Sequence, residues 1–334
     1  MLKVGVIGCG RMGLDHIERI TKRIQGAEVT AVSDVFSENA AKGKAICGCR
    51  IYDNADDVIS DENVDAVLIV SPGSAHADQI IKAVQAGKPV FTEKPMATTA
   101  EDCRRIVDAE IAGKRHLVQV GFMRRYDRGY RQIKTTVDSG EYGESLIVHC
   151  THRNAYVLDD YSTPMAVHDT AIHEIDCFRW LLEEDYVSVQ VIMPKCTKNA
   201  KKDLQDPQIM IMRTESGICI DLEVFVTCRF GYDINCEVVC EEGSITMPQP
   251  AAPVIKHAAR IERELETDFF NRFIDSYDVE IQEWVNSTLE GKVEGPSAWD
   301  GYVAAVTADA LVASQTSGIP EKVDTGIMPE FYKK

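Results

Sequence analysis

The first third of the chain contains several short runs of consecutive apolar residues. Strands that are apolar on both faces belong to a parallel sheet covered by helices. Between two of these runs, residues 77–86 follow a helical pattern with an apolar stripe, and Gly87 stands where the helix should end. The alternation of strand and helix predicts a doubly wound α/β fold. The predicted strands are 4–7, 29–32, 66–70, 89–92 and 117–120.

The pattern changes after about residue 121. Longer segments follow one another, several of them alternating apolar and polar residues, with turns such as 215–217 and 241–243 between them. This arrangement predicts a C-terminal α+β domain built on an open, mostly antiparallel sheet. We therefore expect domains 1–121 and 122–334. The predicted strands of the second are 145–151, 187–193, 209–212, 218–226 and 234–239, and its helices are 166–182, 269–289 and 299–317.

Composition excludes several classes of function. The 334 residues include 36 Lys and Arg against 53 Asp and Glu, a net charge of −17 that opposes binding to nucleic acid. We expect no membrane association, because no apolar stretch approaches the roughly 20 residues that span a bilayer. The eleven cysteines lack CxxC spacing. Free thiols in a reducing compartment are the simplest interpretation, which predicts a cytoplasmic protein.

Gly8-Cys9-Gly10-Arg11-Met12-Gly13 directly follows the first strand and opens a helix. In that context the GxGxxG pattern predicts a dinucleotide site. Gly8 allows the tight turn, Gly10 lets the backbone approach the pyrophosphate, and Gly13 lets helix and strand pack closely. The phosphates would lie against the helix N-terminus.

An acidic residue should end the second strand of such a site, and Asp34 stands there, 21 residues after Gly13. Its carboxylate would accept hydrogen bonds from ribose hydroxyls and repel a 2′-phosphate. The next two residues are Val35 and Phe36, so no Arg directly follows Asp34 to bind a 2′-phosphate. The sequence therefore predicts NAD as the cofactor, in preference to NADP.

Lys94 follows the fourth strand and precedes Pro95, so it stands at the sheet edge where open α/β sheets bind ligands. A solvated surface lysine is the alternative. In the second domain, Asp169, His173 and Asp176 have the i, i+4 and i+7 spacing of one helix face. Two carboxylates around an imidazole suit proton transfer near neutral pH. Surface ion pairing and a metal site remain alternatives, although we expect no metal because no further Cys or His lies at close ligand spacing.

With these residues, the chain resembles the Gfo/Idh/MocA family of nicotinamide-dependent sugar and polyol oxidoreductases along essentially its whole length. The resemblance implies an N-terminal Rossmann domain. Within the family, several segments look most like those of inositol dehydrogenases, which implies NAD-dependent oxidation of a myo-inositol ring hydroxyl to the ketone. These segments are 121–127, 172–176, 230–232 and 295–302.

The family implies roles for particular residues. Lys94 would hydrogen-bond the reacting substrate, His173 would be the general base, and Asp169 would orient and bind substrate. The other implied substrate contacts are Met123, Arg124, His152, Asn154, Asp176 and Tyr232. The implied cofactor contacts are Gly8, Gly10, Arg11, Met12, Gly13, Asp34, Ser71, His76, Glu93 and Lys94.

One segment departs from the family pattern. Many members have an Asn after the proline of the loop that follows the third strand, whereas this chain has Gly73 after Pro72. The departure puts a side-chain contact in doubt but not NAD binding.

Other functions remain open at this stage. The chain could act on scyllo-inositol, another isomer or a sugar such as glucose, it could be a metal-dependent polyol dehydrogenase, or it could be a non-catalytic NAD(H) sensor. Retention of Lys94, Asp169 and His173 together argues against the sensor. Family members commonly pack the exposed face of the C-terminal sheet against a copy of itself. We therefore expect a homotetramer formed through apolar residues of 218–225 and 234–239.

Overall fold

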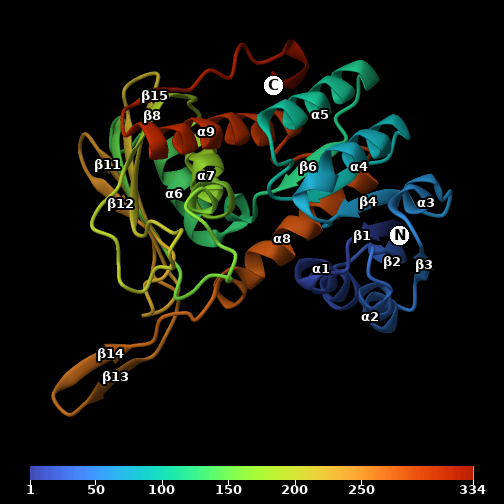
Figure 1. Cartoon of the computed structure of the whole chain (residues 1–334), viewed down its shortest axis with the longest axis horizontal. Helices are drawn as coiled ribbons and strands as arrows, with labels where there is room; N and C mark the ends of the chain where they lie inside the picture. The colour runs from blue at the N-terminus through green and yellow to red at the C-terminus, as the bar shows by residue number, and fades with distance from the viewer. Residues whose placement is uncertain (334) are drawn as a thin grey trace. The chain divides into compact units, whose positions relative to one another are not determined.

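The computed structural model describes residues 1–333, and the chain divides into two units (Figure 1). Unit 1 contains Met1–Phe122, Tyr277–Ala305 and the C-terminal segment from Thr325. Unit 2 contains Met123–Ser276 and Val306–Asp324. Unit 1 therefore includes two segments that come late in the sequence.

Six parallel strands form the sheet of unit 1, in the order β3-β2-β1-β4-β5-β6. Every residue of β4 and β5 is buried, as expected for strands covered on both faces. The predicted doubly wound parallel sheet is thus confirmed. The short, largely exposed edge strand β3 was not predicted. The strands are β1 Leu2–Ile7, β2 Ala27–Ser33, β3 Arg50–Tyr52, β4 Ala66–Ile69, β5 Val90–Glu93 and β6 Val118–Gly121.

Helices cover the sheet of unit 1, with α1 and α2 on one side and α4 and α5 on the other (Figure 1). Local signals set several ends: the side chains of Asn54 and Thr99 cap α3 and α5, and Gly87 follows α4 with a φ of 73°. These helices are α1 Arg11–Lys22, α2 Ser37–Cys47, α3 Ala55–Ser60, α4 Gly73–Gln85 and α5 Ala100–Gly113.

The segment Tyr277–Ala305 of unit 1 contains parts of two long helices. They are α8, Phe269–Leu289, and α9, Ala298–Ser317, close to the predicted 269–289 and 299–317. Ile281, Trp284 and Val285 of α8 belong to the same apolar core as β1 and β2. The C-terminal part of α8 is therefore an integral part of unit 1.

Seven strands form the main sheet of unit 2, in the order β12-β11-β7-β10-β9-β8-β15. The β7–β10 pair is parallel and the other neighbouring pairs are antiparallel, which confirms the predicted mostly antiparallel sheet. The strands are β7 Ser145–Arg153, β8 Tyr186–Ile192, β9 Gln208–Thr214, β10 Cys219–Phe225, β11 Asp233–Cys240, β12 Ser244–Thr246 and β15 Glu321–Lys322. A separate hairpin contains β13 Val254–His257 and β14 Arg260–Arg263.

The predicted helix 166–182 is not one regular helix. Residues Ala166–Ala171 form a π-helix, η2, and α7 begins only at Ile172 and ends at Leu182. The remaining helical segments are the 3₁₀ turns η1 Met123–Tyr126 and η3 Glu330–Tyr332, and α6 Arg128–Asp138. Within residues 1–333, no helix combines the length and apolar character needed to cross a membrane.

Glu110 of α5 joins three segments of unit 1. Its Oε1 accepts the backbone N–H groups of Leu117 and Val118, and its Oε2 accepts the hydroxyl of Tyr332. Because Glu110 is buried, its removal would leave two enclosed N–H donors without an acceptor.

We expect Glu110→Ala to lower the free energy of unfolding by about 2–4 kcal/mol, the sum of two unsatisfied donors. Equilibrium urea denaturation measures this loss. Asp108→Ala is the matched control, because Asp108 lies on the same helix in an exposed ion pair with Arg104. Equal losses in the two variants would contradict the role assigned to Glu110.

Candidate active site

The glycine loop, Gly8–Gly13, connects β1 to α1 and leaves little room for side chains. A Cβ on Gly8 (φ +98°) would lie 2.6 Å from the backbone of Val70 and Ser71, and one on Gly13 would lie 2.1 Å from the Gly8 carbonyl. A Cβ on Gly10, in contrast, would meet no atom within 4 Å. No side chain caps the start of α1. The loop thus offers open space beside backbone N–H groups, as a pyrophosphate requires.

Asp34 lies directly after β2 and contacts the glycine loop. Its Oδ2 accepts the backbone N–H of Cys9 at 2.7 Å, and its Oδ1 accepts that of Phe36 at 2.8 Å. These two bonds fix the orientation of a half-buried carboxylate. Each oxygen keeps acceptor capacity, so Asp34 fits the predicted role toward ribose hydroxyls.

His76 links the loop after β4 to the turn around Lys94. Its Nε2 lies 2.7 Å from the carbonyl oxygen of Ser71, and its Nδ1 lies 3.0 Å from that of Pro95. The ring is 2% exposed, and burial lowers its pKa. The Ser71 hydroxyl donates to Gln79. A structural role is therefore evident for His76, and its contact with a cofactor stays a prediction.

Lys94 and Glu93 stand where β5 ends. Lys94 is half-buried and is followed by a cis peptide bond to Pro95. Glu93 is 7% exposed; its Oε2 accepts the Lys94 backbone N–H at 3.2 Å, and its Oε1 lies 2.7 Å from Nε2 of His16. Burial alone would raise the pKa of Glu93, but the His16 hydrogen bond and the Lys94 charge hold that pKa below its ordinary value. The Glu93 carboxylate is therefore ionised.

The predicted proton-transfer residues lie at the junction of η2 and α7 in unit 2. Asp169 is exposed on the π-helix, whereas His173 and Asp176 are buried in α7. Asp169 belongs to η2, whereas His173 and Asp176 belong to α7, so the three residues come from two helical segments and their common face stays a prediction. A π-turn inside a helix is frequent at functional sites.

Asp176 contacts Arg125, a residue that sequence reasoning did not select. Arg125 donates from Nε to Asp176 Oδ2 at 2.8 Å, and its Nη2 pairs with Oδ1. Asp176 is 2% exposed. The fork of Arg125 thus orients the carboxylate from one side, and a substrate contact of Asp176 stays a prediction.

Arg124 and Glu174 form a second buried ion pair in unit 2, and both are fully enclosed. Glu174 Oε2 lies 3.0 Å from Nδ1 of His152, and Arg124 Nη2 lies 3.1 Å from the same nitrogen. Arg124 also donates to the Tyr130 hydroxyl. Glu174 and Tyr130 were not predicted. The available signal was an acidic residue at a helix position that the apolar pattern assigns to the interior.

His152, His173 and Tyr232 gather in unit 2. The ring of His152 lies 6.4 Å from that of His173 and 5.8 Å from that of Tyr232, centroid to centroid. Burial raises the pKa of Tyr232, and the nearby Arg124 charge opposes part of that rise. Asn154 follows β7, and its Oδ1 is buried and accepts no hydrogen bond from residues 1–333. Met123, also predicted, is buried in η1.

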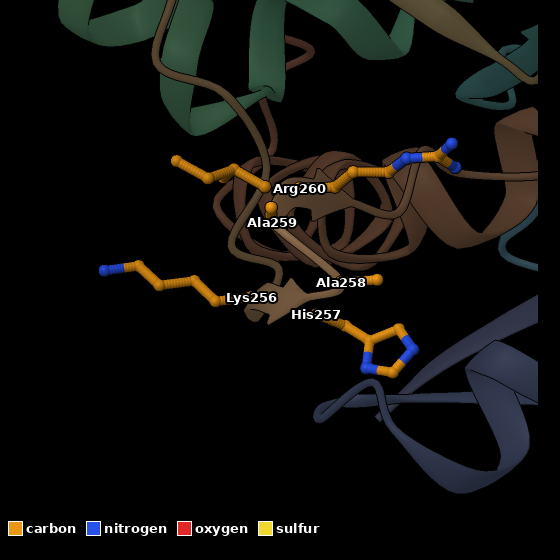
Figure 2. A pocket seen from close by; sticks show the side chains of 6 residues that line it. Lys256, His257, Ala258, Ala259 and Arg260 are labelled. Carbon is orange, nitrogen blue, oxygen red and sulfur yellow. The ribbon is translucent and has the colours of Figure 1, made fainter.

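Within the described residues, no three His, Cys, Asp or Glu side chains are placed to hold a metal ion. A shallow hollow at the tip of the β13–β14 hairpin is lined by residues 256–261 (Figure 2). It contains none of the predicted site residues.

Comparison with known proteins agrees with this arrangement. Residues 2–122 match a family described as "Oxidoreductase family, NAD-binding Rossmann fold" (GFO_IDH_MocA). Residues 134–323 match "Oxidoreductase family, C-terminal alpha/beta domain". The chain is 50% identical to a protein named inositol 2-dehydrogenase from Burkholderia cenocepacia, over 99% of each chain. It is also 50% identical to one of the same name from Serratia proteamaculans, over 100% of this chain and 99% of that one.

Solved structures are similar as well. Myo-inositol dehydrogenase from Lactobacillus casei, in complex with NAD(H) and myo-inositol, shares 39% identity over 100% of both chains with a TM-score of 0.98. Scyllo-inositol dehydrogenase from the same organism, with NAD(H) and scyllo-inositol, shares 25% identity over 97% of this chain and 99% of that one, with a TM-score of 0.87. These findings confirm the resemblance noted in the sequence: the chain belongs to the Gfo/Idh/MocA family of oxidoreductases and binds NAD through its Rossmann fold.

Proposed function

We propose that this protein oxidises a ring hydroxyl of myo-inositol to the ketone, 2-keto-myo-inositol, with NAD as the hydride acceptor. The observation that carries the proposal is 50% identity along the whole chain to proteins named inositol 2-dehydrogenase. The 39% identity to a structure holding NAD(H) and myo-inositol supports the same substrate. Scyllo-inositol, another isomer or a sugar such as glucose remains the second candidate, since the chain is also 25% identical to a scyllo-inositol dehydrogenase.

The glycine loop and Asp34 fit NAD. Gly10 leaves open space where a pyrophosphate would approach the start of α1, and Asp34 holds its carboxylate beside the loop. Arg11, Met12, Ser71, His76 and Glu93 are the further residues proposed to surround the cofactor. When bound, NAD supplies an acceptor for the hydride that leaves the substrate carbon. The Asp34 charge favours NAD over NADP because it repels a 2′-phosphate.

Residues of the chain itself would accept the hydroxyl proton and stabilise the charge that develops on the substrate oxygen. His173 would take the proton of the reacting hydroxyl, and Asp169 would orient the substrate. Lys94, as an ammonium group, would stabilise negative charge that develops on the same oxygen, where such stabilisation lowers the barrier most. Glu93 is ionised next to Lys94 and keeps a balancing charge beside it.

Selectivity toward an uncharged cyclic polyol would come from several hydrogen bonds. Tyr232, His152 and Asn154 offer polar groups from unit 2, and the buried Asn154 Oδ1 needs a donor such as a substrate hydroxyl. Arg124, Asp176 and Met123 would complete the set of residues that contact the substrate. An isomer with one misplaced hydroxyl leaves a buried partner unpaired, which is how such sites reject close analogues.

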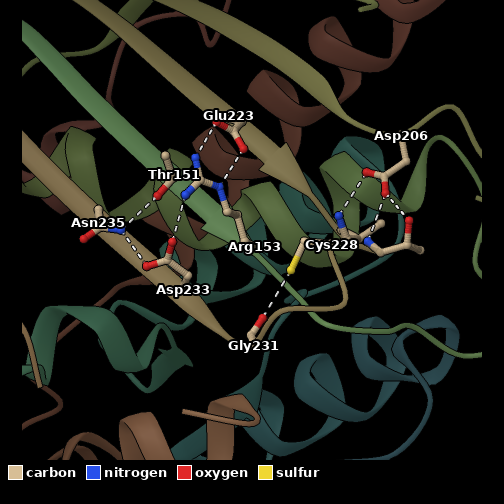
Figure 3. A network of polar contacts seen from close by, with 10 residues as sticks. Thr151, Arg153, Asp206, Glu223, Cys228, Gly231, Asp233 and Asn235 are labelled. Carbon is tan, nitrogen blue, oxygen red and sulfur yellow. Dashed lines mark hydrogen bonds and ion pairs between the residues drawn. The ribbon is translucent and has the colours of Figure 1, made fainter. Parts of the chain in front are cut away.

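The open face of the unit 2 sheet bears on assembly and is more polar than predicted. Most apolar residues of β10 and β11 are buried in the core, and the alternate, half-buried positions include Phe225 and Val239 as well as polar residues, so the predicted apolar contact stays a prediction. On the other face, Arg153 donates twice to Glu223 and once to Asp233, and Asn235 joins Asp233 to Thr151 (Figure 3).

We propose that this open face still joins copies of the chain into a homotetramer, with its charged network paired inside the interface. Sedimentation equilibrium should then give a mass about four times the 37.1 kDa of the chain. A monomer at micromolar concentration would contradict the assembly. The eleven free cysteines support a reducing compartment, and we propose the cytoplasm.

The activity is tested by NADH formation from myo-inositol, scyllo-inositol, chiro-inositol and glucose, with NAD and then NADP. We expect turnover of myo-inositol with NAD. Turnover of another polyol alone would move the substrate to the second candidate. Tight NAD binding without turnover of any of them would favour a sensor, and loss of activity in chelator would reveal a metal-dependent enzyme.

His173→Ala should lower kcat about 10²–10⁴-fold, the usual contribution of a positioned base. NAD affinity, measured by calorimetry, should stay unchanged. His257→Ala is the matched control, because His257 is an exposed imidazole in the β13–β14 hairpin. Near-wild-type turnover in His173→Ala would remove His173 from the mechanism.

Asp34→Ala should weaken NAD binding by about 10-fold or more, the loss of hydrogen bonds to a charged acceptor, and narrow the preference over NADP. Asp34→Asn keeps an acceptor for the Cys9 N–H while removing the charge, so it separates charge from loop structure. Calorimetric titration with both nucleotides measures the effect. An unchanged preference in both variants would exclude Asp34 from the ribose site.

A further inference from the structure

The proposed mechanism does not use His16, although His16 is buried in contact with the residue before Lys94. It lies on α1, the helix that begins at the glycine loop, and its side chain is 0% exposed. Its Nε2 is 2.7 Å from Oε1 of Glu93, and its Nδ1 is 3.2 Å from Nη1 of Arg19. One imidazole thus contacts a carboxylate on one side and a guanidinium on the other.

These two partners assign a different hydrogen-bonding role to each ring nitrogen of His16. A carboxylate can only accept a hydrogen bond, so Nε2 must carry the proton that bonds Glu93. A guanidinium can only donate, so Nδ1 must present its lone pair to Arg19. The two contacts thus give the ring nitrogens opposite roles: Nε2 donates to Glu93, and Nδ1 accepts from Arg19.

Further contacts hold this imidazole in place. The rings of Phe91 and Tyr277 meet it edge-to-face, each 5.9 Å away between centroids. Arg19 donates from Nε to Asp278 of α8 at 2.6 Å, and its guanidinium lies over the Tyr277 ring. These contacts hold the imidazole from several sides, so α1 supplies the Glu93 carboxylate with a constrained donor.

We propose that His16 is a positioning residue for Lys94, holding the Glu93 carboxylate and thereby the backbone at the end of β5. Glu93 transmits this constraint directly, because its other oxygen accepts the Lys94 backbone N–H at 3.2 Å. His76 holds the opposite side of the turn through the Pro95 carbonyl. The inference rests on the proposed function in that Lys94 must act on the substrate for the constraint to affect turnover.

The arrangement also connects two sites within unit 1. The helix that carries His16 begins at Arg11, directly after Gly10 of the glycine loop. A single rigid helix therefore sets both the place of the pyrophosphate and, through Glu93, the place of Lys94. A catalytic group misplaced by about 1 Å can lose about 10²-fold in rate, so such a constraint matters even though His16 touches neither ligand.

The test uses two substitutions of His16 in the full-length protein. His16→Leu removes the donor to Glu93 at similar volume, and His16→Gln restores an amide N–H near the position of Nε2. Ile17→Val is the matched control, because Ile17 is buried on the same helix and makes only apolar contacts. Each variant is measured for NAD affinity, for kcat and KM with myo-inositol, and for hydrogen exchange in the peptide covering residues 90–97.

His16→Leu should lower kcat about 10- to 100-fold and accelerate exchange in that peptide, while NAD affinity changes by less than about threefold. His16→Gln should recover most of the rate and the protection, and Ile17→Val should resemble the wild type. Glu93→Gln combined with His16→Leu should lose no more than the more impaired single variant, because the two residues act as a unit. If His16→Leu does not fold, His16→Ala replaces it in the cycle with Glu93→Gln, because it also removes the donor to Glu93.

Three results would overturn the proposal: a kcat for His16→Leu within about twofold of the wild type, losses that add fully with Glu93→Gln, or unchanged exchange in residues 90–97. Failure of the proposed function has a different signature. In that case the wild-type protein binds NAD and turns over no inositol. The exchange measurement and its dependence on Glu93 still decide whether His16 holds the turn.

Discussion

A carboxylate that is removed from water must be given donors, and the candidate residues of each unit are arranged around this requirement. Glu93 in unit 1 and Glu174 in unit 2 are almost wholly enclosed by protein. Each is the sequence neighbour of a residue assigned to chemistry, since Glu93 precedes Lys94 and Glu174 follows His173. The groups that satisfy these carboxylates, an imidazole on α1 and a guanidinium in η1, therefore also set the backbone on which the chemistry depends.

Stability alone does not account for such pairs. A well-packed apolar pair of similar volume is often as stable as a buried ion pair, because the cost of desolvating two charges is avoided. Contacts between apolar side chains, however, have no preferred direction, whereas hydrogen bonds do. The contact between His16 and Glu93 requires a proton on Nε2 and one ring orientation, and the fork of Arg125 on Asp176 requires two parallel bonds. These buried pairs therefore fix the positions of the side chains that they join.

Much of unit 1 could be predicted from the sequence because its signals are local. The glycine loop and Asp34 are separated by one helix and one strand, and parallel strands bring their carboxyl ends to one edge, which also places Lys94 there. The period-2 segments likewise predicted the sheet of unit 2. Partners of buried charges could not be predicted in this way, since His16 and Glu93 are 77 residues apart and Arg19 and Asp278 are 259 apart.

Other features depend on tertiary packing that no local pattern records. The π-helix η2 interrupts what the spacing of apolar residues predicts as one regular helix, and it leaves Asp169 exposed while His173 is buried. The C-terminal part of α8 packs in the core of unit 1 although its sequence resembles any amphipathic helix. Neither segment contains a Gly or Pro, so no helix-breaking residue marks the irregularity of η2 or the packing of α8.

The polar residues of unit 2 form two layers that the sequence does not distinguish. Arg124 and Glu174 are fully enclosed and form an ion pair, whereas Asn154 keeps a buried acceptor without a donor from the described part of the chain. In the sequence, the paired residues and the unpaired Asn154 alike appear as polar residues among apolar ones. The buried ion pair constrains the segments that carry it, so under the proposed function the groups beside it would meet a substrate at defined positions. A ring with one hydroxyl turned the other way would then leave an acceptor unsatisfied, and rejection of that isomer would follow from the constraint.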